Sequence, residues 1–139
     1  MTEVVLVDAN VMVAVADRSS EHHRACLEAL MAAEDVVIPA LCIAEATYLI
    51  HRDLGASAEA EFLRGMSAFE VVAPAGDDWD RIAQVVAEYS DFKLGGTDAS
   101  IVVLAERLNT DLILTLDHRH FRAIKPRHCE FFRLLPELP

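Results

Sequence analysis

Four acidic residues stand at positions from which their carboxylates could act together. Asp8 and Asp117 each follow a short apolar run, and Asp98 follows a Gly-Gly-Thr sequence. Glu45 is the only charged residue between residues 40 and 50. In open α/β sheets, ligands bind beyond the carboxyl ends of the strands. We therefore expect these acids to meet at one edge of a sheet.

A cluster of this kind needs positive charge. Two carboxylates about 4 Å apart repel by about 4 kcal/mol at an effective dielectric near 20. No lysine or arginine lies within three residues of Asp8, Glu45 or Asp98. Because an all-oxygen donor set suits hard divalent cations, the pattern indicates a Mg²⁺ or Mn²⁺ site. Metal ions held in this way activate water and stabilise oxyanions in phosphodiester cleavage.

Each acid also has a simpler explanation. Asp8 could be a turn residue after a strand, and Asp117 could belong to a plain turn. Asp98 could only complement a helix dipole, which is favourable by about 0.3–1 kcal/mol. Glu45 could point outward or pair with a basic residue later in its own helix. A buried carboxylate without a partner would be costly, so this last explanation requires exposure or pairing.

The elements that must position these acids alternate along the chain. Short apolar runs predict strands at 3–7, 35–38, 69–72 and 111–116, with a possible fifth at 129–133. Helices are expected at 11–16, 19–33, 40–53, 58–67, 77–90 and 98–108. Asn10 is expected to cap the first of these helices. Continuous apolar strands that alternate with helices predict a parallel sheet covered on both faces.

Length and composition narrow the class of protein. A chain of 139 residues predicts a single domain over 1–139, and 53% hydrophobic residues exclude disorder. The longest stretch without polar side chains is Val36–Ala44, shorter than the ~20 residues of a membrane-spanning helix. The three cysteines form no close pair, which fits a reducing cytoplasm. The net charge of −11 argues against a simple nucleic-acid coat protein, but not against a metal-dependent nuclease.

Positive charge is concentrated in one segment, residues 118–133. It holds five of the 12 Lys and Arg residues and only one acid. Candidate phosphate-contacting residues in it are Arg119, Arg122, Lys125 and Arg127. Phe121 could stack on a base. The alternative is a solvated rim in which Phe121, Phe131 and Phe132 belong to the core.

The four acidic motifs together resemble those of PIN-domain ribonucleases. The matching segments are Leu-Val-Asp-Ala-Asn at 6–10, the helical Glu45, Gly-Thr-Asp-Ala at 96–99 and Leu-Thr-Leu-Asp at 114–117. Their order matches, and the intervals of 37, 53 and 19 residues between successive acids are typical of the small members. The resemblance covers essentially the whole chain. Size and compactness point to the VapC toxins of VapBC toxin–antitoxin pairs.

This resemblance implies a fold and an activity. The fold would be a PIN-like three-layer α/β/α sandwich with a central parallel sheet of four to five strands. The activity would be that of a Mg²⁺- or Mn²⁺-dependent endoribonuclease, the toxin of a type II toxin–antitoxin pair. Asp8, Glu45, Asp98 and Asp117 would be the catalytic, metal-binding acids. Asn10 and Thr115 would be polar residues that position the acids or a water molecule.

The resemblance also implies partners. Besides its RNA substrate, the chain would bind a cognate VapB-type antitoxin whose C-terminal segment blocks the acidic site. An arginine of that segment could sit among the carboxylates. A homodimer is expected, with apolar residues in the helices at 40–67 as its interface. These residues are Tyr48, Leu49, Phe62 and Leu63, for which core packing is the alternative. The expected location is the cytoplasm.

Two other functions stay open from the residues alone. One is a different Mg²⁺-dependent phosphoryl-transfer enzyme that uses Asp8. A haloacid-dehalogenase-type phosphatase has a second Asp where Asn10 stands, and a receiver domain has paired acids after the first strand. The other is a catalytically inactive PIN-like module that binds RNA or protein. The presence of all four acids argues against such a loss of catalysis.

Overall fold

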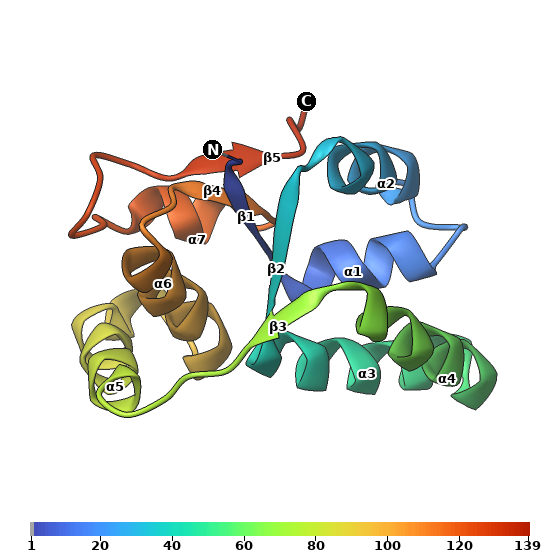
Figure 1. Ribbon diagram of the computed structural model, residues 1–139, viewed down its shortest axis with the longest axis horizontal. Coiled ribbons are helices and arrows are strands. Elements are labelled where there is room, and N and C mark those ends of the chain that lie inside the picture. Colours follow the sequence, from blue (N-terminus) through green and yellow to red (C-terminus); the bar gives the residue numbers. More distant parts are fainter. Residues whose placement is uncertain (1) are drawn as a thin grey trace.

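A five-stranded parallel sheet forms the centre of the computed structural model, which describes residues 2–139 (Figure 1). Its strands are β1 (Val4–Val7), β2 (Asp35–Pro39), β3 (Glu70–Val72), β4 (Leu112–Leu114) and β5 (Arg133–Leu135). They lie in the order β3-β2-β1-β4-β5, and every neighbouring pair is parallel. The predicted α/β class with four to five parallel strands is therefore confirmed.

Helices cover the sheet on both sides. They are α1 (Ala9–Ala16), α2 (His23–Ala32), α3 (Ala40–Leu54), α4 (Ala56–Gly65), α5 (Asp78–Glu88), α6 (Gly96–Leu108) and α7 (His118–Ala123), with single 3₁₀ turns η1 (Met66–Ala68) and η2 (Ser90–Phe92). In Figure 1, α5, α6 and α7 lie to the left of the sheet and α1 and α2 to its right. Within residues 2–139, no helix is both long enough and apolar enough to cross a bilayer.

The core is densest where α6 packs on the central strands. Residues 99–105 of this helix are all buried, and α6 contacts both β1 and β2. A helix that is buried over seven consecutive residues has little freedom to shift. The first turn of α6 is thereby fixed relative to the carboxyl end of β1.

The first and fourth strands bring two of the predicted acids to one edge. Val7 of β1 pairs with Leu114 of β4, and Asp8 N–H donates to the Leu114 carbonyl at 2.9 Å. Asp8 follows β1 directly, and Asp117 lies three residues beyond β4. Parallel pairing therefore places both acids at the same end of the sheet.

Several element bounds differ from the sequence predictions by a few residues, and three differences bear on the site. The fifth strand begins at Arg133, where the expected segment 129–133 ends. The sequence does not predict helix α7, because six residues are too few to show a helical period. Asp8, and not Asn10, caps α1: its side chain accepts a hydrogen bond from Ala9 N at 2.7 Å.

Phe121 belongs to the core and not to a base-stacking surface. Its side chain is completely buried and packs edge-on against Phe132, with ring centroids 6.2 Å apart. Phe131, one residue away from Phe132, is exposed. The expectation that Phe121 stacks on a base is wrong, since no part of its ring reaches the surface.

Candidate metal centre

Asp8 is the most buried acid of the chain. It is 3% exposed, at the junction of β1 and α1. One carboxylate oxygen accepts the Ala9 N–H at 2.7 Å, and the other accepts the Thr115 hydroxyl at 2.8 Å. Because both oxygens have donors, the orientation of this carboxylate is fixed.

Thr115 and Asn10 tie the loop after β4 to the start of α1. The Thr115 hydroxyl donates to Asp8 and accepts the Asp117 N–H at 3.0 Å, so it bridges two of the acids. The Asn10 side-chain oxygen accepts the Leu116 N–H at 3.0 Å. Both residues therefore occupy supporting positions of the kind that the sequence resemblance implied.

Asp98 and Asp117 face each other across the loops that end the sheet. Asp98 lies in the first turn of α6, and Asp117 caps α7. Together with His120 they form a group whose possible ligand atoms all lie within 4.8 Å of one another. All three residues are half-buried.

Glu45 approaches the same centre from α3. Its side chain is exposed, and its carboxylate lies close enough to raise the pKa values of both Asp8 and Asp98. The basic residues that could have paired with it are engaged elsewhere: Arg52 with Asp53, and His51 with Glu59. No local ion pair holds Glu45, and its exposure fits the alternative that the side chain points outward. Its charge nevertheless acts on both Asp8 and Asp98.

The electrostatic state of the centre follows from burial and mutual repulsion. Burial raises the pKa of Asp8 to about 7, and the Asp98 carboxylate adds to this rise. Burial likewise raises the pKa of Asp98 to about 6, with Asp117 and Glu45 adding to it. Within residues 2–139, no lysine or arginine forms an ion pair with Asp8, Glu45 or Asp98.

This donor set fits a divalent metal ion. The four carboxylates come from four separate segments, and burial of Asp8 and Asp98 together with repulsion from their neighbours holds the pKa values of these two acids above the usual range. Oxygen donors with uncompensated negative charge are what hard divalent cations prefer. A bound cation would lower the repulsion that now raises these pKa values.

Two residues of the centre are not among those predicted from the sequence. His120 contacts Asp117, with 2.6 Å between Nδ1 and Oδ2. Cys42 is fully buried on α3, and burial, followed by the nearby Asp8 carboxylate, raises the pKa of its thiol well above the usual value. The spacing of Asp117 and His120 by three residues is a usable signal only once α7 is recognised as a helix.

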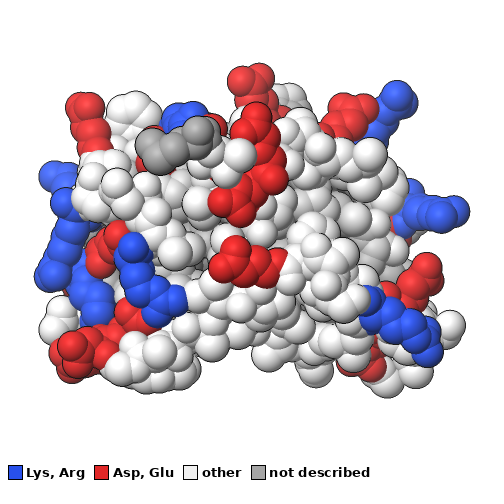
Figure 2. Space-filling model, in the orientation of Figure 1, with Lys and Arg blue, Asp and Glu red and all other residues white. Residues whose placement is uncertain are grey.

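The four predicted phosphate contacts all lie at the surface. Arg119, Arg122, Lys125 and Arg127 are exposed on α7 and the segment after it. Lys125 N–H donates to the Tyr89 hydroxyl at 2.9 Å, which joins this segment to the connection between α5 and α6. Figure 2 shows basic side chains at both the left and the right edges of the molecule, and those on the left lie over the region where Figure 1 places α5, α6 and α7.

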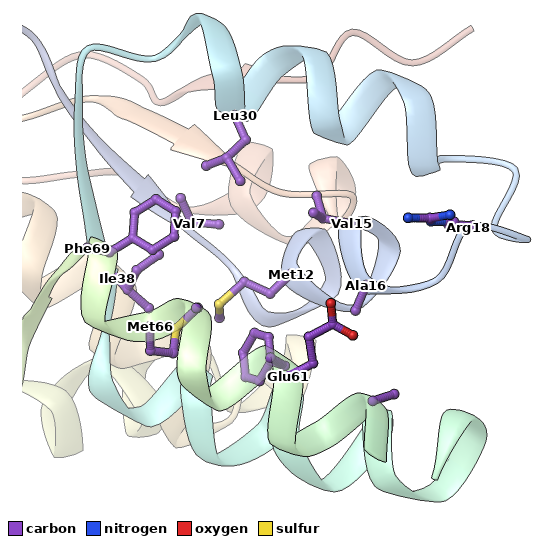
Figure 3. Close-up of a pocket in the computed structure, with 13 residues that line it drawn as sticks. Val7, Met12, Val15, Ala16, Arg18, Leu30, Ile38, Glu61, Met66 and Phe69 are labelled. Carbon is purple, nitrogen blue, oxygen red and sulfur yellow. The ribbon is translucent and has the colours of Figure 1, made fainter. Parts of the chain in front are cut away.

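An apolar cavity of about 420 Å³ lies away from the acids. Figure 3 shows it between α1 and α2 on one side and α4 on the other. Apolar side chains form most of its wall, including Met12, Leu30 and Phe62, while Arg18 and Glu61 are its only charged residues. Its lining fits an apolar ligand or an apolar face of another protein.

The chain is similar to known proteins over most of its length. Residues 5–125 match the PIN domain family. Ribonuclease VapC26 of Mycobacterium tuberculosis strain H37Rv is 33% identical over 134 residues, which cover 94% of this chain and 99% of the relative.

Solved structures with the same fold are much less similar in sequence. VapC20 of M. tuberculosis, a toxin that cleaves the sarcin-ricin loop, superposes with a TM-score of 0.73 at 12% identity, over 78% of this chain and 86% of that one. Rickettsia felis VapBC2, bound to a fragment of promoter DNA, superposes with a TM-score of 0.71 at 15% identity, over 96% of this chain and 99% of that one. A Klebsiella pneumoniae toxin–antitoxin complex superposes with a TM-score of 0.70 at 19% identity, over 95% of this chain and 96% of that one.

The raised pKa of Asp98 predicts that Asp98→Asn stabilises the metal-free protein. Above pH 7 the Asp98 side chain is ionised in both states, and its charge costs more free energy in the folded protein than in the unfolded chain. A pKa rise from 3.8 to about 6 corresponds to about 3 kcal/mol. Solvent screening and the lost contact with the helix dipole reduce the expected gain in the free energy of unfolding to about 1 kcal/mol. We expect the melting temperature in EDTA at pH 8 to rise by about 3 °C.

The stabilisation by Asp98→Asn must depend on pH. A raised folded-state pKa means that folding takes up a proton, so the gain must shrink as the pH falls from 7 toward 4. Asp91→Asn, an exposed substitution on η2, serves as the matched control and should leave the melting temperature unchanged. An equal shift in both variants, or a gain that grows at low pH, would refute the explanation by repulsion.

Proposed function

This chain belongs to the PIN-domain family, and on that basis we propose that it is a Mg²⁺- or Mn²⁺-dependent endoribonuclease, the toxin of a type II toxin–antitoxin pair. The relative that carries the name ribonuclease is similar over nearly its whole length. The observation that carries the proposal is the convergence of four acids, from four separate segments, on one centre without lysine or arginine partners. A core position or a helix dipole would explain one such acid, but not all four.

The acids have separable tasks in this proposal. When bound, a divalent ion supplies a water of lowered pKa and neutralises the charge on the scissile phosphate. Asp8, with both oxygens held by hydrogen bonds, provides a carboxylate of fixed direction. Asp98, Asp117 and Glu45 provide further carboxylate oxygens. Thr115 and Asn10 act as positioning residues, because they fix Asp8 and the loop that carries Asp117.

The other functions are less well supported. A phosphatase of the haloacid-dehalogenase type would need a carboxylate at position 10, where the Asn10 side chain instead accepts a backbone N–H. An inactive binding module would have no use for a buried Asp8 whose pKa is raised to about 7. Such a costly group is kept where it performs chemistry.

RNA would approach along the exposed basic residues beside the acids. Arg119 and Arg122 lie on α7, directly after Asp117, and Lys125 and Arg127 continue the same surface. Contacts from these side chains to phosphate oxygens would position the RNA without reading its sequence. This surface compensates for the strongly acidic net charge of the chain, since it concentrates positive charge where the substrate must bind.

The protein partner in this proposal is a VapB-type antitoxin. Two of the structurally similar proteins are toxin–antitoxin assemblies by their descriptions. We infer that the apolar cavity between α1, α2 and α4 takes an apolar helix face of this partner. A chain that continues past the cavity toward the acids could place an arginine among the carboxylates.

Homodimerisation stays a prediction. Tyr48 on α3 and Leu63 on α4 are exposed, as an interface requires, and Leu49 is half-buried. Phe62 lines the apolar cavity instead, so it is not part of the proposed dimer surface. The proposed location is the cytoplasm, where an intracellular ribonuclease meets its substrate.

Cleavage of total cellular RNA tests the proposal. Purified, antitoxin-free protein is expected to give discrete fragments with Mg²⁺ or Mn²⁺ and none with EDTA. Asp8→Asn and Asp98→Asn should each lower the rate by about 100-fold or more, because each removes a charged metal ligand. The rates are compared on gels at equal protein concentration.

The control for cleavage is Asp91→Asn, which makes the same chemical change on the exposed η2 turn and should cleave like the wild type. Circular dichroism establishes that every variant is folded. Cleavage that survives both active-site substitutions would come from a contaminant. The absence of metal-dependent cleavage in folded protein would favour the binding-module alternative.

The basic surface predicts a salt-dependent loss of RNA binding. In the non-cleaving Asp98→Asn background, the pair Arg119→Gln and Arg122→Gln should weaken binding of a mixed-sequence single-stranded RNA by about tenfold or more. The slope of log K against log salt should fall by about 0.7 for each lost phosphate contact. Fluorescence anisotropy at several salt concentrations measures both quantities.

The matched control for this surface is Arg24→Gln, which removes an exposed arginine from α2. It changes the net charge by one unit without touching α7. For each charge removed, Arg24→Gln should reduce the RNA affinity and the salt slope less than the α7 pair does. Equal reductions per charge would mean that only the net charge of the protein matters. The proposed surface would then be wrong.

The apolar cavity predicts where the antitoxin binds. Ala58→Gln places a polar side chain at the wall of the cavity and should weaken the affinity for a co-purified VapB-type antitoxin by about tenfold. Ser57→Gln makes a similar change one residue earlier on α4, outside the cavity lining, and should bind like the wild type. Calorimetric titration measures the affinities, and unchanged binding by Ala58→Gln would exclude this docking surface.

A further inference from the structure

His120 lies within the acidic centre and is not one of its four acids. Its ring Nδ1 lies 2.6 Å from Asp117 Oδ2, and its backbone N–H donates to Asp117 Oδ1 at 3.3 Å. The short helix α7 enforces both contacts, because Asp117 caps the helix in which His120 occupies the first turn. The histidine is thus held in place independently of any ligand.

The His120 ring also faces the acid on α6. Among the residues that the structure describes, Asp98, Asp117 and His120 are the one group of three whose ligand atoms lie within 4.8 Å of one another. Ligands at about 2.1 Å from an octahedral ion are about 3.0–4.2 Å apart. The 2.6 Å contact between His120 Nδ1 and Asp117 Oδ2 is a hydrogen bond and too short for two ligands of one ion, so the free ring nitrogen Nε2 is the histidine atom that would bind the metal.

We propose that His120 is a nitrogen ligand of the divalent ion, together with Asp98 and Asp117, and that it makes the site prefer Mn²⁺ to Mg²⁺. This inference rests on the proposed function, which supplies the metal. A neutral imidazole has one nitrogen whose lone pair is free to bind a metal. Imidazole nitrogen favours transition metals, whereas Mg²⁺ prefers carboxylate, carbonyl and water oxygens. Asp8 and Glu45 are not part of this group of three, but their carboxylates lie close enough to act on the same centre.

Pulsed electron paramagnetic resonance of the Mn²⁺-loaded protein tests this directly. A directly bound imidazole couples the ¹⁴N nucleus to the unpaired electrons of Mn²⁺, and a histidine that only orients Asp117 does not. The comparison uses the wild type, His120→Gln and the control His51→Gln. His51 is a suitable control because it also contacts a carboxylate, Glu59 at 2.9 Å, on the exposed end of α3.

The ¹⁴N coupling is expected in the wild type and in His51→Gln, and it should be absent from His120→Gln. Calorimetric titration should show that His120→Gln weakens Mn²⁺ binding by about tenfold or more and Mg²⁺ binding by less. Thermal unfolding establishes that each variant is folded. A wild-type protein that binds Mn²⁺ without ¹⁴N coupling, or a coupling that persists in His120→Gln, would overturn the proposal.

RNA cleavage by the same Mn²⁺-loaded samples separates this inference from the proposed function. Metal-dependent cleavage without ¹⁴N coupling would refute the ligand role of His120 and leave the ribonuclease proposal intact. A folded wild type that neither binds Mn²⁺ nor cleaves RNA would overturn both. Equal losses of Mn²⁺ and Mg²⁺ affinity in His120→Gln would refute the proposed preference between the two ions.

Discussion

Repulsion between neighbouring carboxylates, strengthened by the burial of Asp8 and Asp98, is the interaction on which the rest of this molecule depends. Asp8 is almost fully buried, and Asp98, Asp117 and Glu45 all face the same centre. No lysine or arginine among the described residues forms an ion pair with Asp8, Glu45 or Asp98. Such an arrangement destabilises the metal-free protein and persists only when the surrounding structure leaves the side chains no alternative. It is also what gives the centre its affinity for a cation.

The surrounding structure removes those alternatives by fixing each acid through a different element. Asp8 caps α1, which is worth about 0.5–2 kcal/mol and offsets part of the cost of its burial. Asp98 is carried by α6, whose buried middle cannot move without opening the core. Asp117 caps α7 and is joined to Asp8 through the Thr115 hydroxyl. Asp8 and the loop that carries Asp117 therefore cannot separate unless the hydrogen bonds through Thr115 are broken.

The convergence of the acids could be predicted from the sequence because the carboxyl ends of parallel strands meet at one edge, whatever the details of the loops. The contacts within the loops could not be predicted from the sequence. His120 joins the centre through α7, and six residues carry no recognisable helical period. Phe121 is an aromatic residue among basic ones, and this sequence context fits either stacking on a base or packing in the core. Only its packing against Phe132 shows that it belongs to the core. The sequence predicts the last strand at 129–133, over two phenylalanines, yet pairing with β4 begins at Arg133.

The same repulsion links catalysis to inhibition in the proposed toxin. Any ligand that binds only the folded state stabilises it by an amount that grows with the logarithm of its concentration and affinity. A divalent ion and the guanidinium of a partner arginine would both neutralise Asp8 and Asp98, and they would compete for one space. The ion carries two charges at a single point, whereas guanidinium carries one charge and five hydrogen-bond donors. An antitoxin therefore needs a second attachment to displace the ion, and the apolar cavity bounded by α1, α2 and α4 offers one at a distance from the acids.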